Sequence, residues 1–196
     1  MTDNVLKPQP AVEALHHPGT RLNDVIRYWA SLRDGNEPPR RSQIEAAALA
    51  QALPDVFLAE IITPRIARFR LCGHRIEDLM GMDMRGMPLT VLFQGGARQE
   101  IADALEQVAL GARVMLSLQG ESGFGLPSLS ASLALLPLTD DSGRITRILG
   151  VIDRTGTPGR CPRRFTLAGP QTLPRAPRAP AAPVQPVLRV INGGKG

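Results

Sequence analysis

Cysteine and histidine are scarce in this chain, and their scarcity limits its chemistry. The 196 residues include two cysteines and three histidines. Cys72 lies in a region of regular patterning and Cys161 in a proline-rich end, so we expect free thiols in a reducing compartment rather than a disulfide. Cys72 and His74 stand two residues apart, but no third ligand or general base occurs at a recognisable spacing. We therefore predict no metal site and no catalytic residue, and an enzyme is the least favoured class.

Long apolar runs are absent as well. No stretch of about 18 apolar residues occurs, which excludes a helix that spans a membrane. The N-terminus, MTDNVLKPQP, lacks the basic start and the apolar centre of a signal peptide. We therefore expect a cytoplasmic protein without membrane insertion.

Acidic residues are absent from the C-terminal end. Residues 158–196 hold seven Lys and Arg, eight prolines and no Asp or Glu, whereas residues 1–157 hold 16 Lys and Arg against 18 Asp and Glu. The net charge of +5 therefore belongs to this end. Such a segment cannot bury enough apolar surface to offset its chain entropy, so we predict a disordered tail over 158–196, and a flexible leader over 1–19. No helix-turn-helix pattern accompanies the charge, and we expect no nucleic-acid partner.

Apolar residues recur at helical spacing directly after the leader, and they predict an amphipathic helix over residues 20–34. This stripe needs an apolar partner. It covers the open face of its own sheet, or it packs against a second copy of the chain or another protein, and the pattern does not decide between these. In the second case the dimer or partner interface consists of Leu22, Val25, Ile26, Trp29 and Leu32.

The region up to residue 157 combines strand and helix patterns. An alanine-rich stretch over 44–53 is predicted to be helical, and short helical patterns follow His74. Period-two alternation and turn signals predict five strands, and the longest later helix covers residues 98–110. The strands are expected at 56–62, 66–72, 113–118, 128–135 and 145–152. One α+β domain over 20–157 follows, with a five-stranded antiparallel sheet and short helices between strands two and three.

This element order resembles the PAS domain and, more narrowly, the alphaproteobacterial single-PAS family called PAS_5. The resemblance is carried by Tyr28-Trp29, Pro39-Arg40-Arg41, Phe69-Arg70-Leu71-Cys72-Gly73-His74-Arg75-Ile76, Met80-Gly81-Met82-Asp83-Met84-Arg85-Gly86 and Gly150-Val151-Ile152-Asp153-Arg154-Thr155. It implies a bacterial regulatory protein whose sheet cups a small cavity under short helices. Such domains bind a cofactor or metabolite, or pair with other proteins.

The resemblance also implies a ligand pocket, which we expect to be walled by Phe69, Leu71, Leu79, Met80, Leu92 and Leu133. Haem-binding relatives place a histidine on the long helix before the third strand, and residues 98–110 contain none. Flavin-binding photosensors need a reactive cysteine where residues 81–94 have none. We therefore expect a small apolar ligand or none. A redox or gas sensor with haem or flavin is the alternative.

The end of the domain bears on how a signal leaves it. PAS domains often continue through a helix into an output domain. Here Gly156, Pro158, Gly159 and Pro162 follow the last motif, and no such helix can begin. We therefore predict a stand-alone signalling module that acts by non-covalent association with a protein partner or with itself.

Overall fold

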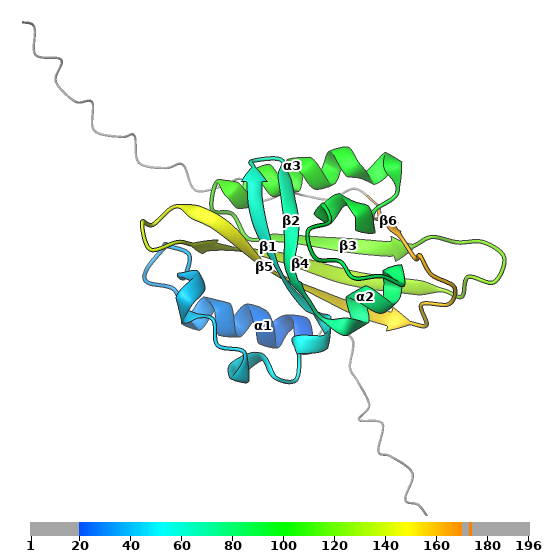
Figure 1. Cartoon of the computed structure of the whole chain (residues 1–196), viewed down its shortest axis with the longest axis horizontal. Coiled ribbons are helices and arrows are strands. Elements are labelled where there is room, and N and C mark those ends of the chain that lie inside the picture. The colour runs from blue at the N-terminus through cyan, green and yellow to red at the C-terminus, as the bar shows by residue number, and fades with distance from the viewer. Residues whose placement is uncertain (1–19, 170–172, 174–196) are drawn as a thin grey trace, which may run out of the picture.

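The computed structural model describes residues 20–169 and 173, which form one α+β domain (Figure 1). Its six-stranded antiparallel sheet has the order β2-β1-β5-β4-β3-β6. The strands are β1 (Val56–Thr63), β2 (Ile66–Cys72), β3 (Val114–Gly120), β4 (Leu129–Thr139), β5 (Ile145–Gly156) and β6 (Phe165–Leu167). The α-helices are α1 (Thr20–Ser31), α2 (His74–Met80) and α3 (Arg98–Ala109). Single 3-10 turns are η1 (Arg41–Gln43), η2 (Ala47–Leu49), η3 (Leu53–Asp55), η4 (Leu89–Leu92) and η5 (Gly95–Ala97).

The two faces of the sheet have separate apolar cores. We call the face under α2, α3 and η4 the inner face, and the face under α1 and the first three 3-10 turns the outer face. Alternation along the strands sends residues to the two faces in turn. On β1, Phe57 and Ala59 belong to the inner core, while Val56 and Leu58 belong to the outer core. The amphipathic patterns in the sequence therefore meet apolar partners on both sides.

The connection between α2 and α3 blocks both edges of the sheet. At the β2 edge, the backbone N–H of Gly86 donates to the Phe69 carbonyl at 2.8 Å, and Phe69 donates to the Met87 carbonyl at 3.0 Å. At the opposite edge, Gln94 donates to the Phe165 carbonyl at 2.9 Å. These bonds satisfy three backbone groups at the sheet edges: the N–H and carbonyl of Phe69 and the carbonyl of Phe165.

The sheet has one strand more than the five predicted. β6 lies inside residues 158–196, so the predicted boundary of a disordered tail at 158 is wrong. Phe165 is fully buried in the inner core, and Arg163, which precedes it, is 1% exposed. A three-residue strand in a proline-rich segment carries no periodic signal, and it forms here because the edge of β3 offers backbone partners. Residues 170–172 and 174–196 of the predicted tail, and the predicted leader over 1–19, lie outside the described residues.

The alanine-rich stretch predicted as one helix over 44–53 forms separate 3-10 turns instead. The Tyr28 side chain of α1 explains part of the difference, because its hydroxyl accepts a hydrogen bond from the Glu45 N–H at 2.9 Å and donates to the Gln43 carbonyl at 3.2 Å. Of the residues in this stretch, Leu49 and Ala52 are buried against the outer face. Tertiary contacts thus override the helix propensity of alanine.

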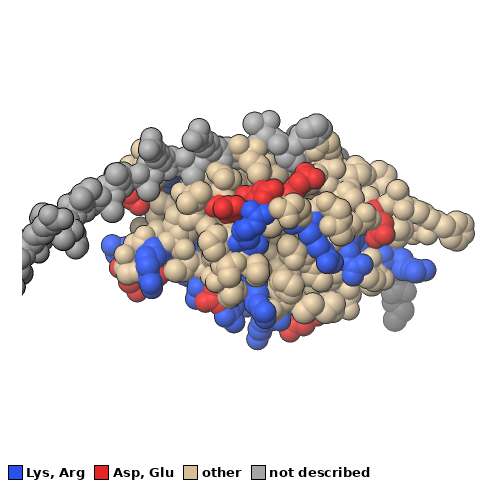
Figure 2. Space-filling view, turned by 90° about the horizontal axis from the view of Figure 1, so that it is seen from above, with Lys and Arg blue, Asp and Glu red and all other residues tan. Residues whose placement is uncertain are grey.

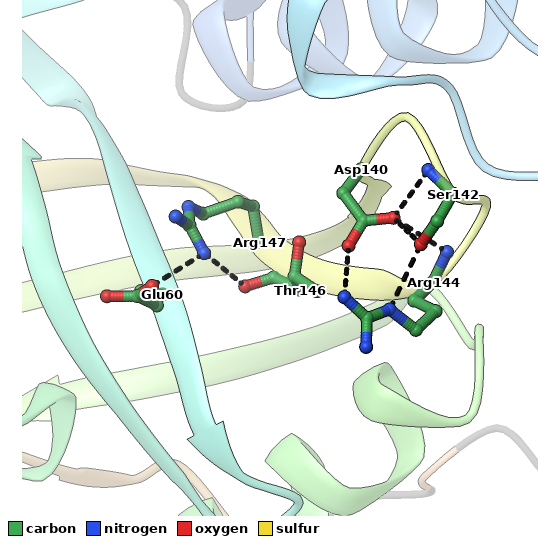
Figure 3. Close-up of polar contacts among 6 residues, drawn as sticks. All are labelled: Glu60, Asp140, Ser142, Arg144, Thr146 and Arg147. Atoms are coloured by element: carbon green, nitrogen blue, oxygen red, sulfur yellow. Dashed lines mark hydrogen bonds and ion pairs between the residues drawn. The ribbon is translucent and has the colours of Figure 1, made fainter.

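Asp140 organises the turn between β4 and β5 (Figure 3). Its Oδ1 atom accepts hydrogen bonds from the Ser142 N–H at 2.9 Å, the Ser142 hydroxyl at 2.6 Å and the Arg144 N–H at 3.1 Å. The Ser142 hydroxyl bond is the largest of the effects that hold the Asp140 pKa below its ordinary value. This bonding pattern closes the turn that the sequence Asp-Asp-Ser-Gly favours.

Candidate functional site

Five of the six predicted pocket residues come together on the inner face. Four of them have no exposed surface: Phe69, Leu79, Leu92 and Leu133. The fifth, Met80, is 4% exposed. All five belong to the inner core, where the Phe57 and Phe69 rings meet edge to face with 5.1 Å between their centroids. The inner face is therefore lined by apolar side chains, as the pattern of the sequence indicates.

Leu71, the sixth predicted pocket residue, is misplaced by the sequence reasoning. Leu58 pairs with Leu71 and Ala59 pairs with Phe69, which leaves Arg70 as an extra residue in a β-bulge. The bulge shifts the alternation by one position, so Leu71 shares the outer face with Leu58. Its side chain is 53% exposed.

The apolar stripe of the leading helix lies against its own sheet. Leu22, Val25 and Trp29 are buried at 4%, 0% and 3% exposure, and the Trp29 indole N–H donates to the Pro137 carbonyl of β4 at 2.9 Å. Ile26 and Leu32 are half-buried. Of the two alternatives, the structure therefore shows that the helix covers its own sheet. Its three buried residues have no free surface left for a second copy of the chain.

An open apolar groove of about 280 Å³ remains beside α1 on the outer face. Turns η2 and η3 form one wall, and the β1–β2 hairpin forms the other. Leu53 and Leu71 stand at its rim with 41% and 53% of their surface exposed. Its apolar lining includes Ile44, Leu49, Leu53, Leu58, Leu71 and Leu149. Because α1 packs chiefly on β4 and β5, no described helix covers this part of the outer face.

A single arginine gives the groove its charge. Arg41 lines the groove, and its guanidinium makes no ion pair or side-chain hydrogen bond with the described part of the chain. Its partial burial beside apolar side chains lowers the local dielectric, which strengthens its attraction for an incoming carboxylate. The groove therefore combines apolar walls with one available cation.

Asp55, at the end of η3, ties the two helix layers together. Its Oδ2 atom lies 2.6 Å from Arg21 Nη1 of α1 and 3.1 Å from Arg75 Nη1 of α2. The Asp55 side chain is 2% exposed, whereas the two arginines keep 24% and 35% of their side-chain surface. A buried carboxylate with two cationic donors is a strong, orientation-dependent contact. It joins the outer helix to the inner helix around the start of β1.

Arg154, in the closing motif of the sequence, extends this charged cluster. Burial lowers the pKa of its guanidinium, and the nearby Asp55 and Asp78 carboxylates oppose that shift. Its buried Nη1 atom has no hydrogen-bond partner in the described residues. Strand β5 thus brings the partly buried guanidinium of Arg154 near the Asp55 carboxylate, which contacts both α1 and α2.

A second ion cluster crosses the outer face of the β2-β1-β5 edge (Figure 3). Glu60 Oε1 lies 2.8 Å from Arg147 Nη1, and Arg70 pairs with the other carboxylate oxygen. Hydrogen bonding from Arg70 is the largest cause that lowers the Glu60 pKa. These side chains keep this part of the outer face polar.

The two cysteines occupy different environments. Cys72 is half-buried and packs against the inner core, and burial, followed by the charges of Glu77 and Asp83, raises the pKa of its thiol to about 12. Cys161 is exposed, and His74 begins α2 at the surface. Among residues 20–169 and 173, no group of three His, Cys, Asp or Glu side chains could hold a metal ion.

Sequence reasoning missed the groove and the Asp55 cluster. Arg21, Asp55 and Arg75 are far apart along the chain, and nothing in their local patterns pairs them. One signal was available in the glycine that follows Cys72. A Cβ atom at Gly73 would lie 2.3 Å from the Leu53 carbonyl oxygen, so this motif position packs α2 directly against η3. That close approach brings Arg75 within reach of Asp55.

Comparisons with known proteins give one family match and a set of similar solved structures. None of the helices in the described ranges is long and apolar enough to cross a membrane, and no curated protein matches the chain. Similar solved structures include a light-oxygen-voltage domain studied with a flavin analogue, with 18% identity and a TM-score of 0.41 over 56% of this chain and 83% of that one. The dark structure of the aureochrome 1 light-oxygen-voltage domain has 17% identity and a TM-score of 0.43 over 63% of this chain and 89% of that one. An RNA-binding light-oxygen-voltage receptor has 20% identity and a TM-score of 0.41 over 59% of this chain and 35% of that one.

The family assignment comes from the sequence itself. The model of the PAS_5 family, described as a PAS domain, matches residues 16–153. This range includes α1, the inner core up to Ile152, strands β1 to β4 and most of β5. The chain belongs to the PAS_5 family of PAS domains.

Proposed function

We propose that this PAS protein is a signalling module whose output is the binding of a protein partner in the outer-face groove. The observation that carries the proposal is the groove of about 280 Å³, which keeps Leu53 and Leu71 exposed on the outer face. Binding sites are concave and mostly apolar, with few polar groups that set orientation. The Arg41 guanidinium supplies such a group here.

The groove specifies the chemistry of its partner. One or two apolar side chains on a helix or turn would fill the space between η3 and the β1–β2 hairpin. A carboxylate next to them would pair with Arg41 in a partly desolvated setting. We therefore expect an acidic, amphipathic segment of another protein.

A small apolar ligand on the inner face would gate this groove through shared residues. Phe57 and Cys72 belong to the inner core and also line the groove. A ligand that displaces inner-core side chains would shift β1 and β2 together, because close-packed side chains transmit such displacements. The Asp55 contact would carry the same displacement to α1.

The groove can be tested with two variants of one hairpin. Leu71→Glu places a charge at the groove rim, while Ile62→Glu places the same charge at a β1 position that is 48% exposed and outside the groove. We expect the immobilised full chain to retain a specific cytoplasmic protein, and only Leu71→Glu to lose it, by roughly tenfold or more. The proposal fails if the wild-type chain retains nothing specific, or if both variants retain the protein equally.

The alternative of a cofactor-bearing sensor has a direct readout. The visible absorption spectrum of the purified native protein would show a haem or flavin band if such a group occupied the inner face. If such a band appears, haem or flavin takes the place of the small apolar ligand as the group that gates the groove. A colourless protein that still binds its partner is the result we expect.

A further inference from the structure

The loop between β3 and β4 carries a fully exposed aromatic side chain at its tip. Phe124 has a relative exposure of 108%, and the loop projects beyond the sheet at the right of Figure 1. The Leu126 N–H donates to the Gly123 carbonyl at 3.1 Å, which makes Phe124 and Gly125 the central residues of a tight turn. Gly125 has φ +74°, the value that a type II turn requires at its second central position. The backbone thus holds Phe124 at the tip.

The base of this loop is fixed by a buried arginine. Arg163 is 1% exposed, and its guanidinium donates to the Pro127 carbonyl at 2.5 Å and to the Pro158 carbonyl at 2.7 Å. The Glu121 N–H also donates to the Arg164 carbonyl at 2.8 Å. Hydrogen bonds therefore join the base of the loop to the start of the C-terminal segment.

The loop carries one charged residue, Glu121 at its base, and the C-terminal segment beside that base carries only positive charge. Residues 122–130 contain no charged side chain, and the projecting end in Figure 2 shows none, with charged side chains only behind it. The segment that begins at the loop base, residues 158–196, holds seven Lys and Arg without a single acid. The loop with the exposed Phe124 is thus joined at its base to the start of the basic C-terminal segment.

We infer that Phe124 anchors the protein to the surface of an anionic lipid bilayer. The ring and the uncharged tip of the loop reach only the surface boundary between headgroups and acyl chains, and the basic residues of 158–196 other than the buried Arg163 are attracted to the anionic headgroups. Two such signals together give reversible binding that neither gives alone, and no spanning segment is needed. A single-stranded nucleic acid fits the loop less well, because its sites place cations beside the stacking ring.

Vesicle co-sedimentation tests the anchor on the full chain. The probes are vesicles of phosphatidylcholine alone and vesicles in which phosphatidylglycerol replaces part of it. We expect the protein to bind the anionic vesicles only, and Phe124→Ser to lower its partition by roughly tenfold. The matched control is Leu110→Ser, since Leu110 is 59% exposed and follows α3, before the opposite end of β3. Replacing Arg160, Arg175 and Arg178 with glutamine should weaken binding by a similar factor.

A fluorescence measurement separates insertion from simple charge attraction. The chain has one tryptophan, Trp29, and it is buried in the outer core. In Phe124→Trp, the new indole should shift its emission to shorter wavelength when anionic vesicles are added, while the wild-type emission stays unchanged. The inference is overturned if the protein stays in the supernatant, if Phe124→Ser binds as the wild type does, or if single-stranded RNA rather than vesicles produces the Phe124→Trp shift.

Discussion

Replacing Trp29 tests whether α1 belongs to its own sheet. The indole is 3% exposed among outer-core side chains, and its N–H donates to the Pro137 carbonyl at 2.9 Å. Trp29→Phe keeps an aromatic ring but leaves that buried carbonyl without its donor. Trp29→Ala removes the ring as well, and Trp29→Glu puts a charge into the outer core.

The expected losses follow from these contacts. The unpaired carbonyl in Trp29→Phe should lower the free energy of unfolding by about 1–3 kcal/mol. The cavity in Trp29→Ala should cost about 3–5 kcal/mol, a large part of the stability of a domain this size. Arg27→Ala, on the exposed side of the same helix, should change stability by less than about 0.5 kcal/mol.

Urea denaturation followed by circular dichroism measures these losses, and light scattering measures the mass of each variant. We expect Trp29→Phe to be less stable than the wild type, and Trp29→Ala and Trp29→Glu to be less stable than Trp29→Phe. The mass of Trp29→Glu should equal that of the wild type. A Trp29→Glu protein with wild-type stability and half the wild-type mass would refute the packing of α1 on its own sheet, and would show that the stripe joins two copies.

Three further predictions address the cluster, the sixth strand and the thiols. Asp55→Asn should lower the free energy of unfolding by about 2–3 kcal/mol in urea titration, because it leaves two arginines without their buried carboxylate; wild-type stability would show that the ion pairs contribute nothing. Phe165→Ala should cost about 3–5 kcal/mol by the same assay, and a negligible loss would mean that β6 is not part of the core. Iodoacetamide at mildly alkaline pH should label the exposed Cys161 and spare Cys72, because the Cys72 thiol has a pKa of about 12 and stays protonated there. Mass spectrometry of the digested protein measures the labelling of each cysteine, and equal labelling would contradict the prediction.

The sequence predicted most of the secondary structure, because the signals concerned are local. Helices α1 and α3 follow the spacing of their apolar residues, and β1 and β2 follow a hairpin pattern with a proline turn. Five of the six residues that the resemblance implied for a pocket lie in the inner core, and strand alternation accounts for Phe69 and Leu133 among them. The alternation is interrupted at the bulge beside Leu71, so an unbroken pattern puts that residue on the wrong face.

By itself, the sequence determined the PAS element order and the concentration of basic charge after residue 157. Tertiary structure decided which face each apolar stripe covers, because burial depends on segments that meet only after folding. It paired Arg21 and Arg75 with Asp55, and it added β6 at an edge where β3 had free backbone groups. Within the described residues it also left two apolar features uncovered: the outer-face groove, which α1 does not reach, and Phe124 at the tip of the β3–β4 loop.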